Sequence, residues 1–187
     1  MRQRSIARAS RRGPGAFASI LPRLTGAEID ARACTLRPDD TKDLLSELFG
    51  LHWREIRFGV LGGGVEWEIQ AAQPPRIVPL NDGTVTLHFG SWHLHLRVGD
   101  RPGLERPDPE RVQSLIFFRL LDEEQSPTEW GVQLLNGRGE QQMTVLLPSP
   151  LRDEDDRPLP RPDWARLALW NRLRRRYGAG AEEVAKG

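Results

Sequence analysis

The chain has one cysteine, Cys34, and no apolar run near the roughly 20 residues that a membrane-spanning helix needs. A single cysteine excludes an internal disulfide, and Cys34 has no companion thiol that would make it reactive, so we regard it as incidental. The first residues are basic but lack the apolar stretch of a signal peptide. These absences predict a cytoplasmic protein of bacterial type that does not enter a membrane.

Lysine is also scarce: Lys42 and Lys186 are the only two lysines, and all the other Lys or Arg positions are arginine. Abundant arginine suits recognition of planar anions, but it is also typical of a GC-rich genome. The 187 residues are 38% hydrophobic and 28% charged, with a net charge of +1, a globular composition sufficient for one core. Basic residues crowd both ends, which predicts a flexible basic arm over 1–37, a single domain over 38–178 and a flexible tail over 179–187.

Hydrophobic periodicity predicts the elements of that domain. Alternating residues indicate hairpins over 54–69, 84–98 and 129–147, and the glycines at 62–64 form a turn between strands, because no phosphate-binding Lys-Ser/Thr follows them. Helical spacing and end signals predict helices over 39–49, 108–120 and 163–177. A further short helix is expected near 19–24. Hairpins without crossover helices predict an α+β fold with an antiparallel sheet of about six strands and helices packed on one face.

Three of the four histidines fall in one predicted hairpin. Gly90–Ser91 has glycine first, as a two-residue type II′ turn requires, and this turn would fix the register of the flanking strands. Counting from it places His88 directly opposite His93, with His95 two residues further along the same face. The alternating apolar residues would point the other way, into the core, so that the three imidazoles share the open, polar face of the sheet.

Imidazoles on one face are the ligands that zinc and iron prefer among nitrogen donors. The sequence therefore predicts that His88, His93 and His95 bind a transition metal (Zn or Fe) or haem. Glu66 and Glu68 alternate outward on another strand and would complete the ligand set if that strand is adjacent. Arg97 would lie on the same face as His95 and orient a carboxylate or phosphate of the bound cofactor.

Other interpretations remain open from the sequence. The face can be an ordinary polar sheet surface, or the histidines can act as acid–base catalysts without a metal. The chain can instead be an accessory subunit that docks a protein partner or a second copy of itself, through the open sheet face or the arginine-rich last helix with Arg174–Arg176. Nucleic-acid binding by the basic arm is the least favoured class, and whether the protein is an enzyme is undetermined.

Overall fold

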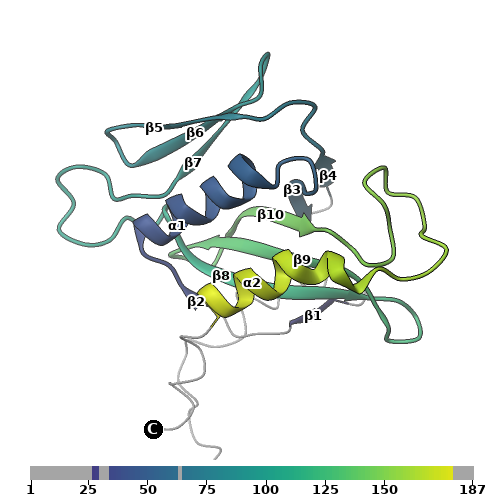
Figure 1. The fold of residues 1–187 in the computed structure, drawn as a ribbon. Helices are drawn as coiled ribbons and strands as arrows, with labels where there is room; N and C mark the ends of the chain where they lie inside the picture. The colour runs from purple at the N-terminus through teal and green to yellow at the C-terminus, as the bar shows by residue number, and fades with distance from the viewer. Residues whose placement is uncertain (1–26, 30–33, 63–64, 179–187) are drawn as a thin grey trace, which may run out of the picture.

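The computed structural model describes residues 27–29, 34–62 and 65–178, which form two antiparallel sheets and two α-helices (Figure 1). The strands are β1 (Ala27–Ile29), β2 (Cys34–Thr35), β3 (Arg57–Gly62), β4 (Val65–Ile69), β5 (Arg76–Pro79), β6 (Thr84–His88), β7 (His93–Arg97), β8 (Val112–Leu121), β9 (Pro127–Asn136) and β10 (Gln141–Leu147). The helices are α1 (Pro38–Leu45), continued by the π-helical η3 (Ser46–Leu51), and the 3₁₀ turn η4 (Trp164–Leu167), continued by α2 (Ala168–Tyr177).

The larger sheet has the order β1-β8-β9-β10-β3-β4, and the two-residue β2 also pairs with β8. Every pairing is antiparallel, and β3–β4 and β9–β10 are the hairpins expected from alternation. Gly62 pairs with Val65, so the glycine-rich segment does connect two paired strands. The predicted α+β fold with an antiparallel sheet of about six strands is confirmed.

The strands β5, β6 and β7 form a separate three-stranded sheet, whereas the sequence predicted one sheet only. Its apolar side packs into the same core as the helices: the ring of Phe89 lies 5.2 Å from Phe58 and 6.2 Å from Phe49. On the far side of this core, Trp170 of α2 meets Phe117 of β8 edge-to-face at 5.2 Å. One continuous core thus holds both helices and the small sheet on the large sheet.

The helix predicted over 108–120 is wrong, because these residues form the long strand β8. The run is buried on both faces of the sheet: Phe117 belongs to the main core, and its neighbours Ile116 and Phe118 point the opposite way yet are at most 1% exposed. A strand buried on both sides has a continuous apolar sequence, which periodicity alone cannot distinguish from a buried helix. The cap-like Asp108 belongs instead to a charged loop that precedes the strand.

The far face of the large sheet is not open at its centre. Leu135 of β9 and Leu146 of β10 are both buried, as are Ile116 and Phe118 of β8. The middle strands of the large sheet therefore lack the free face expected from the sequence. The three histidines lie on the smaller sheet, on β6 and β7.

The segment predicted as a basic arm ends in two short strands, since β1 and β2 both pair with β8. Cys34, for which the sequence predicts no role, is 4% exposed and lies in the main core. The predicted helix near 19–24 and the tail 179–187 lie outside the described residues. Within the described part of the chain, no helix is long and apolar enough to cross a membrane.

Candidate functional site

The predicted histidine hairpin is present, with the predicted register. Gly90 has φ +84°, and the amide of Phe89 donates to the carbonyl oxygen of Trp92 at 2.9 Å, closing the two-residue turn. His88 pairs with His93 across β6 and β7. His93 and His95 are exposed and His88 is half-buried. His88, His93 and His95 share one outward surface, which we call the histidine face.

The three imidazoles touch in series along this face. The ring centres of His88 and His93 are 5.4 Å apart, and those of His93 and His95 are 4.7 Å apart. Nδ1 of His95 is hydrogen-bonded to the hydroxyl of the buried Thr86 at 2.9 Å, which orients that ring and leaves Nε2 as its outward nitrogen. Among the described residues, no three candidate ligand groups converge as they would around an ion. The rings are thus gathered, but their nitrogens are not pointed at one position.

His88 differs electrostatically from an exposed histidine. Its partial burial lowers the pKa of the imidazole, and the positive charges of Arg76, His93 and His95 lower it further. A lowered pKa keeps His88 neutral, with a lone pair available, at pH values where an ordinary histidine begins to protonate.

Arg76 is a residue of this face that the sequence analysis missed. It lies on β5 directly opposite His88, and its side chain is exposed. The sequence contained a signal for the pairing of β5 with β6, though not for its register, since the short apolar segment Ile77–Val78 is followed by the turn Asn81–Gly83 that leads into β6. Pairing β5 with β6 across that turn brings Arg76 beside the histidines.

Glu66 and Glu68 are not brought to the histidine face. Both lie on β4, which pairs with β3 at the edge of the large sheet and has no pairing with β6 or β7. The carboxylate of Glu68 is 3.5 Å from the guanidinium of Arg57. The adjacency on which their proposed role depended does not occur.

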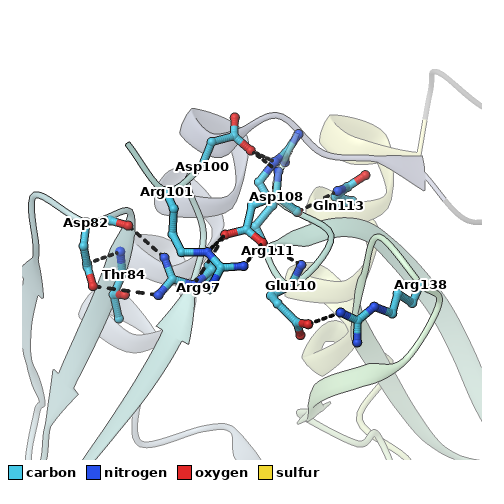
Figure 2. Close-up of polar contacts among 10 residues, drawn as sticks. All are labelled: Asp82, Thr84, Arg97, Asp100, Arg101, Asp108, Glu110, Arg111, Gln113 and Arg138. Atoms are coloured by element: carbon cyan, nitrogen blue, oxygen red, sulfur yellow. Dashed lines mark hydrogen bonds and ion pairs between the residues drawn. The ribbon is translucent and has the colours of Figure 1, made fainter. Parts of the chain in front are cut away.

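Arg97 lies at the opposite end of the face, in an ionic cluster (Figure 2). Its Nη1 donates to the carbonyl oxygen of Asp82 at 2.8 Å, and its guanidinium lies 3.8 Å from the carboxylates of both Asp82 and Asp108. Asp108 is fully buried and accepts two hydrogen bonds from Arg101, at 2.7 and 3.1 Å. The hydrogen bonds from Arg101 hold the pKa of Asp108 below its usual value. Arg97 therefore contributes to the contact between the small sheet and the loop before β8.

Two arginines of the arginine-rich last helix, Arg172 and Arg176, form contacts within the chain. Arg172 donates to Glu47 at 2.7 Å and lies 2.7 Å from Nε2 of His52, the one histidine outside the histidine face. Arg176 pairs with Asp43 at 2.6 Å. These ion pairs hold α2 against α1 and η3, so part of its positive charge has an internal role.

Comparison with known proteins places the fold. ChuX aligns with a TM-score of 0.53 at 11% identity, over 79% of this chain and 78% of its own. Protein AGR_C_4470 from Agrobacterium tumefaciens aligns with a TM-score of 0.53 at 18% identity, over 88% of this chain and 84% of its own. At these identities the likeness is one of fold. No curated protein sequence matches significantly. A family model described as a family of unknown function, DUF7676, matches residues 19–179, and the chain therefore belongs to that family.

Proposed function

We propose that this protein binds a transition metal, zinc or iron, or a metallocofactor such as haem, through His88, His93 and His95. The observation that carries the proposal is the series of three contacting imidazoles on one outward sheet face, held by a hairpin of fixed register.

The spacing of the rings supports shared coordination. Imidazole nitrogens bind zinc at about 2.0–2.1 Å, and two rings on one tetrahedral ion then have centres roughly 5 Å apart. The separations of 5.4 and 4.7 Å lie near this value, so binding requires rotation of side chains and no change of strand register. The hydroxyl of Thr86 would hold the ring of His95 in place from behind, as outer hydrogen bonds commonly do for ligating histidines.

The chemistry of the donor set fits this ligand class. Neutral imidazole is a good ligand for zinc, iron and haem iron, and the lowered pKa of His88 favours that neutral form. Because β4 lies in the other sheet, we assign no carboxylate of Glu66 or Glu68 to the site. A bound metal would supply Lewis-acid or redox chemistry at the surface of the small sheet.

The test is metal analysis and absorbance spectroscopy of protein purified without a histidine tag, followed by titration with Zn²⁺, Fe²⁺ and haem. The double variant His93→Ala/His95→Ala should lose most of the binding. His52→Ala is the matched control, because His52 contacts Glu55 and Arg172 away from the histidine face, and it should bind as the native chain does. Absence of binding by the native protein, or equal binding by the double variant, would refute the proposal.

A further inference from the structure

Arg76, His88 and His93 form one row across the three strands of the small sheet. Arg76 on β5 pairs with His88 on β6, which pairs in turn with His93 on β7. Directly opposed residues in antiparallel strands have Cα atoms about 4.5–5.5 Å apart and side chains on the same face. The side chain of Arg76 is thus on the same face as the two imidazoles, on the strand next to His88 and one strand further from His93.

The side chains of Arg76 and Arg97 differ in the ion pairs and hydrogen bonds that they make. Within the described residues, the side chain of Arg76 has no ion pair or hydrogen bond, whereas that of Arg97 is held by Asp82 and Asp108. Arg97 is two residues along β7 from His95 but four from His93, and the latter separation corresponds to about 13 Å at the rise of a strand. Of the two arginines, Arg76 is the one that is both beside the histidine row and available to an external anion.

An uncompensated cation at this place has an electrostatic consequence. Arg76 lies directly opposite His88, so its positive charge disfavours a bare divalent ion bound to that imidazole. A metal complex that bears a negative oxygen group would experience the opposite effect, because guanidinium binds carboxylates and phosphates through paired N–H donors.

We propose that the histidine face takes a metal complex bearing a carboxylate or phosphate group, and that Arg76 binds this group and selects such complexes over bare metal ions. This inference rests on the proposed function and assigns to Arg76 the role that the sequence analysis gave to Arg97. The ligand class is an anionic metal complex, with the metal toward the imidazoles and the oxygen group toward β5.

The experiment measures the affinity of the native chain, Arg76→Ala and the control Arg161→Ala for two probes, haem and Zn²⁺ alone. Arg161 is an exposed arginine in the segment before η4, so its loss alters net charge equally without touching the small sheet. For Arg76→Ala we expect about fivefold or greater loss of haem affinity, together with unchanged or tighter binding of Zn²⁺. Both affinities should stay at the native values in Arg161→Ala.

Two further arms identify the oxygen group. Haem dimethyl ester has no free carboxylates. The native chain should therefore have no higher affinity for this ester than Arg76→Ala has for haem. Added inorganic phosphate should tighten Zn²⁺ binding by the native chain and not by Arg76→Ala if a phosphate serves instead. If the native chain binds haem and Zn²⁺ but Arg76→Ala changes both affinities equally or not at all, the role of Arg76 is refuted and the metal site stands. If the native chain binds neither probe, the proposed function itself fails.

Discussion

We expect truncation of either of the two adjacent phenylalanines of β8, Phe117 or Phe118, to lower the free energy of unfolding by a large and similar amount. Phe117 packs edge-to-face on Trp170 in the main core. Phe118 points to the other side of the sheet, lies opposite Gly131 of β9 and covers that glycine with its ring. Both side chains are fully buried. Each of Phe117→Ala and Phe118→Ala should therefore remove a complete aromatic ring from packed surroundings.

Removal of a fully buried phenylalanine costs about 3–5 kcal/mol, which combines the lost burial with the cavity that remains. For a chain of this size, 1 kcal/mol corresponds to a change in Tm of about 2–4 °C, so each variant should melt roughly 6–20 °C below the native protein. Urea denaturation followed by tryptophan fluorescence gives the free energy of unfolding directly. Leu104→Ala is the control, since Leu104 is 47% exposed and its truncation should cost about 0.5 kcal/mol or less.

The Phe118→Ala result is the decisive one. An open far face, as expected from the sequence, would leave Phe118 in contact with solvent and make its truncation nearly neutral. A loss below about 1 kcal/mol for Phe118→Ala, with a full loss for Phe117→Ala, would contradict the two-sided burial of β8.

Three further predictions concern single positions. Gly83 has φ +87°, and an added Cβ would lie 2.6 Å from the carbonyl oxygen of Gly99, so Gly83→Ala should destabilise by at least about 1–2 kcal/mol in thermal unfolding; a neutral result would contradict this turn geometry. Hydrogen bonds from Arg101 lower the pKa of Asp108, so the folded state binds fewer protons than the unfolded state between the unfolded value of about 3.9 and the lower folded value. The free energy of unfolding therefore decreases as the pH falls through that window. Urea denaturation at pH 7 and pH 3 should show a smaller decrease for Asp108→Asn than for the native chain. Burial raises the pKa of Tyr177 to about 12, and absorbance titration reads it alone because the chain has one tyrosine. The buried hydroxyl of Tyr177 has no hydrogen-bond partner among the described residues, so the free energy of unfolding of Tyr177→Phe should be about 1 kcal/mol higher than that of the native chain; a lower value would contradict this reasoning.

The features predictable from sequence are those that neighbouring residues determine. The Gly90–Ser91 turn fixes a two-residue loop, and strand alternation then sets the pairing of His88 with His93 by counting. The β9–β10 hairpin and the Asp163 cap before η4 follow from equally local rules. In each case the information lies within a few residues of the structure that it specifies.

The identity of β8 depends on distant partners and could not be read locally. Its apolar run with Asp108–Glu110 in front satisfies the signals of a capped, buried helix. What selects the strand is hydrogen bonding to β9 along its length and to β1 and β2 at its other edge. Those partners come from segments before and after β8 in the chain, and the same long-range pairing separates β4, with Glu68, from the histidine face.

Arg76 stands between these two cases: the anion-binding role that we propose for it is the one that the sequence predicts for Arg97. Leu80 and Thr84 close the connection between β5 and β6 with a 2.7 Å hydrogen bond, and the flanking Pro79 pairs with Val85. A connection of that length admits several registers, unlike the two-residue turn after His88, so the sequence alone does not specify which residue of β5 faces the histidines. Arg97 is on the hairpin whose register can be counted, and counting places it on the same face as His95, two residues further along the strand. Its carboxylate neighbours come from the β5–β6 turn and the loop before β8. Only the assembled fold shows that they occupy its guanidinium, while that of Arg76 has no partner in the described part of the chain.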